Sequence, residues 1–226
     1  MYNAFKNIVF FTLAIALSGY LNSESDNEID AVDETIRLIG IENVTRNITT
    51  HEANDVAKKL MLEGLFYDAI SVIENIKEKD IISYLMLGVI EYIENGNNDK
   101  AMSVFNKISD NPISMYFIGN IYKDNDDPNK AIYWIEQSAK YGFLNAQYQL
   151  SLLYMEFGFY NKAYIWARCA TLNGYHDTHS LVNTFENNIF LIDKKQTIDS
   201  IYNTRTCPFN IKYSKEFEKL GYKSIH

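Results

Sequence analysis

A dipeptide that returns at a regular interval constrains the fold of this chain more than any other feature. Lys-Ala, preceded by one alanine at the same phase, gives the series Ala69, Lys100-Ala101, Lys130-Ala131 and Lys162-Ala163. Successive alanines are 32, 30 and 32 residues apart. An interval in the low thirties accommodates two short helices and two turns, so the series predicts a stack of helix pairs. Such stacks usually act through a surface rather than through a catalytic pocket.

Other residues recur at fixed positions relative to these alanines. Three residues later stand the large apolar residues Val72, Val104, Trp134 and Trp166. We expect these four side chains to fill the space between neighbouring hairpins. Turn positions are marked by Gly64, Gly96, Asp126 and Gly158 before the alanines, and by Gly142 and Gly174 after the last two. Glycine there predicts a left-handed backbone conformation.

Small residues also recur inside the first helix of each predicted pair. They end three matching segments, Ser83–Gly88, Ser114–Gly119 and Ala146–Ser151. Glycine within a helix costs roughly 1 kcal/mol relative to alanine. Its return at one phase therefore predicts that the two helices of a pair approach each other closely there.

Two stretches carry a family resemblance. The first comprises Tyr116, Ile118, Gly119, Tyr122, Asn129, Lys130, Ala131, Trp134, Ala139 and Gly142. The second comprises Ala146, Tyr148, Leu150, Ser151, Tyr154, Asn161, Lys162, Ala163, Trp166, Ala170 and Gly174. Both resemble Sel-one-like repeats of the tetratricopeptide-like superfamily, and the resemblance covers about residues 52–175. Two positions depart from the pattern, since Ser151 replaces the usual glycine and Glu91 the usual aromatic residue.

The N-terminus has the pattern of a secretory signal peptide. Lys6 is the only charged residue before the apolar run Ile8–Leu17, and Ala16 and Ser18 form a small-residue cleavage site. The run is too short to cross a hydrocarbon core of about 30 Å. We therefore expect export, to a bacterial periplasm, with membrane contact only through the signal peptide. An uncleaved anchor is the alternative, and Tyr20 stands where a lipid-bearing cysteine would be needed.

The resemblance and the periodicity together predict an all-α chain, an α-solenoid of about four stacked antiparallel helix pairs. Its expected parts are the signal peptide (1–18), an acidic leader with a short helix over 29–41 (19–51), the repeats (52–175), and capping helices with a tail (176–226). A closing helix pair over 178–188 and 196–204 is expected because the last hairpin would otherwise expose an apolar face. The tail from Cys207 is apolar, and we expect it to fold back on the array.

The charge of the chain narrows the class of partner. Its formal net charge is −8, and removal of residues 1–18 would make it about −9. An acidic surface repels phosphate backbones, so nucleic acid is not an expected partner. It favours a basic protein partner, or it serves only solubility.

Few residues suggest covalent or metal chemistry. Cys169 and Cys207 either form a disulfide in an oxidising compartment or remain two separate thiols, one of them a buried small hydrophobe. His176, Asp177 and His179 are interpreted as a polar turn rather than a metal site. Two glycosylation sequons, at Asn43 and Asn47, would matter only in a eukaryotic secretory pathway. We expect no catalytic residue, metal or cofactor.

In stacked helix pairs the first helices line the concave face. By register, the residues free for a protein partner are Tyr84, Met86, Met115, Phe117, Asn120, Gln147 and Gln149. Aromatic and thioether side chains provide contact area, and amides fix orientation; the alternative is that they pack against the next repeat. The resemblance implies a non-enzymatic adaptor, scaffold, or immunity protein that neutralises a secreted toxin. The alternatives are an enzyme acting on cell-wall material and a lumenal adaptor of a eukaryote.

Overall fold

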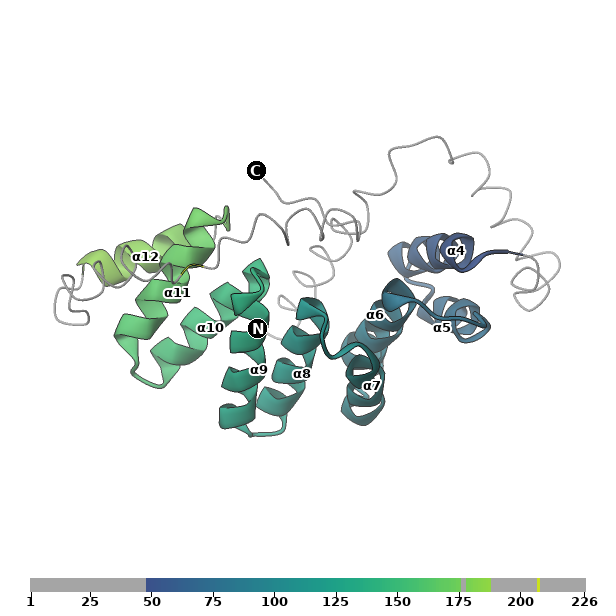
Figure 1. Ribbon diagram of the computed structural model, residues 1–226, viewed down its shortest axis with the longest axis horizontal. Helices are drawn as coiled ribbons and strands as arrows, with labels where there is room; N and C mark the ends of the chain where they lie inside the picture. Colours follow the sequence, from purple (N-terminus) through teal and green to yellow (C-terminus); the bar gives the residue numbers. More distant parts are fainter. Residues whose placement is uncertain (1–47, 176–177, 188–206, 208–226) are drawn as a thin grey trace. The chain divides into compact units, whose positions relative to one another are not determined.

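The computed structural model describes residues 48–175, 178–187 and Cys207 (Figure 1). Every regular element within these ranges is helical, so the all-α prediction is confirmed for the part of the chain that is described. None of the described helices is long and apolar enough to cross a membrane. The described residues divide into two compact units, which meet in sequence between Ile108 and Ser109.

Several predictions concern residues outside the described ranges. They are the signal peptide (1–18), the short helix (29–41), the sequons at Asn43 and Asn47, the second closing helix (196–204), and the turn residues His176 and Asp177. All residues of the tail after Cys207 also lie outside them.

The first unit contains two helix pairs. Its elements are α4 (Thr50–Leu62), α5 (Phe66–Glu74), α6 (Ile81–Val89), the π-helix η1 (Ile90–Glu94), α7 (Asn98–Phe105) and the 3₁₀ turn η2 (Asn106–Ile108). Helix α4 packs against α5, α6 packs against α7, and α5 also contacts α6 and η1. Side chains of all these contacts meet in one core that includes Ala57, Ala69, Val72, Ile73 and Ile90.

The start of α4 shows how the sequence places a helix end. The Thr49 hydroxyl accepts a hydrogen bond from the Glu52 amide at 3.3 Å, and a Glu52 carboxylate oxygen accepts one from the Thr49 amide at 2.6 Å. This reciprocal arrangement is a capping box, which satisfies two backbone donors that the first helical turn leaves free. The hydrogen bond from the Thr49 backbone is also the main reason that the pKa of Glu52 is lowered.

The second unit contains two further pairs and a closing helix. Its helices are α8 (Pro112–Asp124), α9 (Pro128–Lys140), α10 (Leu144–Glu156), α11 (Tyr160–Leu172) and α12 (Thr178–Asn187). Helix α8 packs against α9, and α10 packs against both α9 and α11 (Figure 1). Helix α12 covers α11 and corresponds to the first helix of the predicted closing pair.

The turn prediction is confirmed at all six positions. The φ angles are positive at Gly64 (80°), Gly96 (61°), Asp126 (56°), Gly142 (86°), Gly158 (74°) and Gly174 (91°). At the end of α8, Asp126 in this conformation lets the Asp127 amide donate to the Tyr122 carbonyl at 2.9 Å. The last carbonyls of the helix are thereby satisfied. Aspartate is one of the few side chains that tolerate this backbone region.

The small residues inside the first helices have the predicted role. A Cβ atom added to Gly88 would lie 2.5 Å from Cε1 of Phe105, and one added to Gly119 would lie 2.5 Å from Cγ1 of Ile135. Neither distance is tolerable for carbon atoms, so the missing side chain lets the second helix of each pair come close. Ser151, at the same phase in the next pair, is fully buried and donates to the Tyr148 carbonyl at 2.7 Å.

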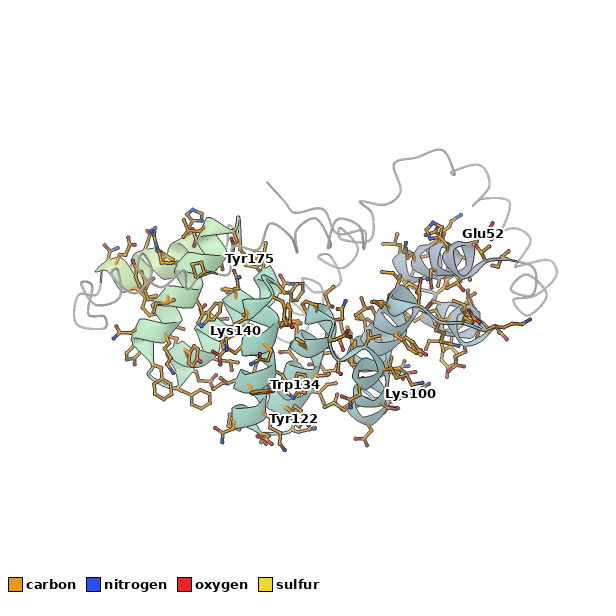
Figure 2. The ribbon with its side chains drawn as sticks, in the orientation of Figure 1. Glu52, Lys100, Tyr122, Trp134, Lys140 and Tyr175 are labelled. Carbon is orange, nitrogen blue, oxygen red and sulfur yellow. A yellow bond between two sulfur atoms is a disulfide. The ribbon has the colours of Figure 1, made fainter. Side chains whose placement is uncertain are left out.

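The two tryptophans differ in burial, although the sequence treats them alike. Trp166 is 7% exposed, which agrees with the predicted core site. Trp134, which Figure 2 labels, is only partly buried. Its ring meets the exposed Tyr133 ring edge-on at a centroid distance of 5.6 Å. The prediction that Trp134 fills a core site is therefore only partly met.

Candidate partner-binding surface

The seven residues predicted for a partner surface are mostly buried. Tyr84 on α6 is partly buried. The other six are buried: Met86, Met115, Phe117, Asn120, Gln147 and Gln149. Tyr84 and Met86 belong to the first unit, and the remaining five belong to the second. Register along a helix therefore does not establish that these side chains are free for a ligand.

Gln147 has a structural role in the second unit. Its Nε2 donates to the Ala139 carbonyl at 3.2 Å, and its Oε1 accepts from Nδ2 of Asn173 at 2.9 Å. The side chain is fully buried. It thus joins the C-terminal ends of α9 and α11, and it gives the Ala139 carbonyl a second donor beside the Gly142 amide at 2.9 Å.

A similar amide joins two helices of the first unit. The Asn54 side chain on α4 donates through Nδ2 to the Asp80 carboxylate at 2.9 Å and accepts from the Ser83 hydroxyl at 2.8 Å. Asn54 and Ser83 are buried, and Asp80 also caps α6 by accepting from the Ser83 amide at 2.8 Å. Buried amides of this chain therefore stabilise helix packing.

Four aromatic rings of the second unit form two pairs. This aromatic cluster consists of Tyr116 on α8, Phe143 before α10, Tyr148 on α10 and Tyr175 after α11. Figure 2 labels Tyr175. Tyr116 meets Phe143 edge-on at a centroid distance of 5.3 Å, and Tyr148 stacks on Tyr175 at 5.1 Å with 24° between the planes. Tyr116 is buried, whereas the other three are partly exposed. The cluster thus combines one buried ring with three that are partly exposed.

Asn120 lies beside the buried ring of the aromatic cluster. Burial raises the pKa of Tyr116, whereas a hydrogen bond with the Asn120 side chain lowers it in part. The Asn120 side chain therefore lies beside the Tyr116 hydroxyl. This contact is looser than an ordinary hydrogen bond, because Nδ2 of Asn120 meets no acceptor at the usual hydrogen-bond geometry.

Tyr148, Tyr175 and Phe143 were not among the predicted surface residues. Tyr148 was treated only as part of the repeat pattern, although it precedes the predicted Gln149. Tyr175 and Phe143 each follow a turn glycine, Gly174 and Gly142. An aromatic residue directly after each of these glycines is a sequence signal that could have drawn attention to them.

Tyr84 belongs to a separate and smaller surface feature in the first unit. The Lys107 ammonium group lies 5.3 Å from the centroid of the Tyr84 ring. Cation–π contacts at exposed sites contribute about 0.5–1 kcal/mol. Tyr84 is thus accessible, but no second aromatic ring of the described residues stacks on it.

The repeated lysines make a second kind of contact. Lys130 lies 5.0 Å from the Tyr122 ring, and Lys162 lies 5.2 Å from the Tyr154 ring. In the first unit Glu91 stands where these repeats have tyrosine, and Nζ of Lys100 contacts its Oε1 at 2.6 Å. Asn95 donates to the other carboxylate oxygen at 3.0 Å. An ion pair therefore replaces the lysine–tyrosine contact at the one repeat where the sequence departs from its pattern.

Replacing Lys100 by methionine should destabilise the first unit by about 1–2 kcal/mol. The Glu91 carboxylate is 3% exposed and would lose its cation, whereas Lys100 is 45% exposed, so the cost falls below that of a fully buried pair. Chemical denaturation at neutral pH measures the change. Lys130→Met, whose lysine is 60% exposed and pairs with Asp127, is the matched control and should change stability little.

The same pair predicts a pH dependence. The hydrogen bond with Glu91 is the largest cause of the raised pKa of Lys100, and the raised value lies above that of the unfolded chain. The stability that this ion pair adds to the folded state is therefore fully present below the pKa of Lys100 in the unfolded chain. It is lost as the pH rises through the pKa of Lys100 in the folded protein. Denaturation midpoints of the parent and Lys100→Met should therefore converge above about pH 10.5. A constant difference up to pH 12 would contradict this origin.

The two cysteines form a disulfide. Cys169 on α11 is joined to Cys207 by a disulfide, with 5.2 Å between the Cα atoms. Cys169 is fully buried. Within the described ranges, no group of three His, Cys, Asp or Glu side chains could hold a metal ion.

Comparison with known proteins leaves the family open. No family model matches the chain, and no curated protein matches it. The resemblance to Sel-one-like repeats rests on the residues quoted for it, and membership of that family remains a prediction.

Proposed function

We propose that this chain is a secreted, non-enzymatic helical-repeat protein of Sel-one-like type, and that it acts in a bacterial periplasm by binding a protein partner. In this proposal the four helix pairs continue one solenoid, with the first helices along its concave face. Successive first helices begin at Thr50, Ile81, Pro112 and Leu144, which is the regular spacing that a solenoid requires.

The aromatic cluster supports a partner site in the second unit. Stacked, partly exposed tyrosines provide a large contact area at a low cost in conformational entropy. Hot spots of protein interfaces are enriched in such residues, particularly where the surrounding atoms are already well packed. Tyr148 stacks on Tyr175, and Tyr116 meets Phe143 edge-on, so the partly exposed rings are already packed against other rings before a partner arrives. The proposal thus moves the site from the buried Phe117 and Gln149 to their neighbours.

The chemistry of the partner follows from charge and surface type. A chain of net charge −8 attracts a basic protein over a distance and repels nucleic acid. An immunity protein that neutralises a secreted basic toxin fits these features, and so does an envelope scaffold. The buried amides of Gln147 and Asn54 are engaged in hydrogen bonds that hold helices together.

Tyr148→Ala should raise the dissociation constant of the complex about thirtyfold, which corresponds to a loss of about 2 kcal/mol in binding free energy. The partner would first be captured in the periplasm with a photo-crosslinking amino acid at position 148, then purified and titrated by calorimetry. Tyr67→Ala is the matched control, because Tyr67 is 87% exposed in the first unit and lies outside the proposed site. Equal affinities of Tyr148→Ala and the parent would exclude the aromatic cluster as the site.

A further inference from the structure

The turn that follows η1 contains one residue more than the corresponding turns of the other helix pairs. After α4, α8 and α10, the amide that follows the left-handed residue donates to a carbonyl five residues earlier. These bonds, of 2.8–2.9 Å, run from Leu65 to Leu60, from Asp127 to Tyr122 and from Phe159 to Tyr154. After η1, the corresponding bond runs from the Asn97 amide to the Glu91 carbonyl at 2.8 Å, six residues earlier. The main chain therefore accommodates one extra residue between Glu91 and Asn97.

A π-helical turn accommodates this residue. The Asn95 amide donates to the Ile90 carbonyl at 3.1 Å, five residues earlier instead of the four of an α-helix. The sequence has the same surplus, because Gly96 follows Gly88 by eight residues. In the next two pairs the interval is seven residues, from Gly119 to Asp126 and from Ser151 to Gly158. Single π turns within helices are rare and frequently mark functional positions.

The extra residue decides which side chain meets the repeated lysine. Tyr122 and Tyr154 each lie three residues after the small residue of their helix and four before the left-handed residue. Around η1 these two counts give different residues, since Glu91 satisfies the first and Tyr92 the second. Glu91 occupies the position opposite the lysine, with 2.6 Å between its Oε1 and Nζ of Lys100. The extra residue thus exchanges a tyrosine ring for a carboxylate.

Lys100 extends this contact to the preceding helix pair. Its Nζ also lies 3.6 Å from Oε1 of Glu74, which is on α5. That contact is exposed, and exposed ion pairs contribute little by themselves. Glu91, however, is 2% exposed, and its second oxygen accepts from Asn95 at 3.0 Å, so the buried carboxylate holds the ammonium group in one position. The three charged side chains thereby connect α5, η1 and α7.

We propose that η1 is a one-residue insertion that builds a clamp of Glu91, Lys100 and Glu74, and that this clamp holds the first two helix pairs together. Glu91 is then a positioning residue, because it acts on α5 through Lys100. In the second unit the corresponding lysines, Lys130 and Lys162, contact tyrosine rings instead. The clamp does not depend on the proposed function, since it concerns contacts within the first unit.

Single-residue deletions in the full chain test the insertion. Deletion of either Glu91 or Tyr92 restores the seven-residue interval, so both variants should keep the helical signal of the parent in circular dichroism. Deletion of Tyr122 is the matched control. It removes a residue from a regular helix and rotates the residues after it by about 100°, so much of the helical signal should be lost. A loss as large as that of the control in either of the first two variants would overturn the proposal.

Lys100→Met in the two deletion variants tests the clamp itself. Deletion of Tyr92 leaves Glu91 opposite the lysine, whereas deletion of Glu91 puts Tyr92 there. Without Tyr92, Lys100→Met should accelerate hydrogen exchange of the α5 amides about fivefold or more, measured by mass spectrometry of peptides from α5. Without Glu91, the same substitution should have a much smaller effect.

Lys100→Arg keeps the cation and is the conservative control for this experiment. In the chain without Tyr92 it should leave exchange of the α5 amides close to that of the lysine form. Equal acceleration by Lys100→Met in both deletion variants, or no acceleration in the chain that keeps Glu91, would overturn the proposal. Both measurements use the chain without a partner, so a failed clamp and a failed partner interaction give different results.

Discussion

Trp166→Ala should lower the free energy of unfolding by about 3–5 kcal/mol, the largest effect that we expect from a single substitution in this chain. The Trp166 side chain is 7% exposed, so its removal leaves a large cavity between packed helices. Trp134→Ala, at the same repeat position, should cost clearly less because its ring is only partly buried. Urea denaturation followed by circular dichroism measures both.

The difference between the two tryptophans tests the packing more sharply than either variant alone. Equal losses in the two variants would mean that both rings fill equivalent core sites, as the repeat pattern suggests but the structure does not. If Trp166→Ala melted within a degree or two of the parent, the assignment of Trp166 to the core would be wrong.

Gly119→Ala should destabilise the second unit by about 2–3 kcal/mol. The added Cβ would lie 2.5 Å from Cγ1 of Ile135, 3.1 Å from the Ile135 backbone nitrogen and 3.2 Å from the Ala131 carbonyl oxygen. A side chain can turn away, but two backbone atoms of α9 cannot move without separating the helices. Thermal denaturation of the purified variant gives the change in stability.

Ser151→Ala is the control for the glycine variant. It stands at the same phase in the next helix pair, where a Cβ is already accommodated, and it removes only the hydroxyl that donates to Tyr148. We expect a loss of about 1 kcal/mol, typical of one hydrogen bond. A Gly119→Ala variant as stable as Ser151→Ala would show that the close approach of α8 and α9 is not essential.

The helices and turns could be predicted because local rules determine them. The 30–32 residue interval placed the pairs, and the turn positions were recognised even where Asp126 replaces glycine, since the left-handed backbone recurs at one phase. Gly88 and Gly119 indicated close helix contact because a helical glycine costs stability unless another contact compensates. These features depend on neighbours within one hairpin.

The surface could not be predicted in the same way. Helical register shows which residues share a face, but it does not show what covers that face. Phe117 and Gln149 were assigned to a free surface and are buried, whereas the neighbouring Tyr148 is accessible and stacks on Tyr175, 27 residues later. Contacts between the end of one helix and a turn of another depend on the packing of whole helices, which a repeat pattern does not encode.

The central claim is that the chain acts by binding a protein through the aromatic cluster. A photo-crosslinking amino acid at position 148 in the full chain, expressed in its own compartment, tests it most directly. The account predicts one dominant protein adduct that is absent when the same amino acid replaces the 87% exposed Tyr67, and a purified partner whose affinity falls about thirtyfold with Tyr148→Ala. The same adducts at both positions, or a purified partner that binds Tyr148→Ala as tightly as the parent, would contradict it.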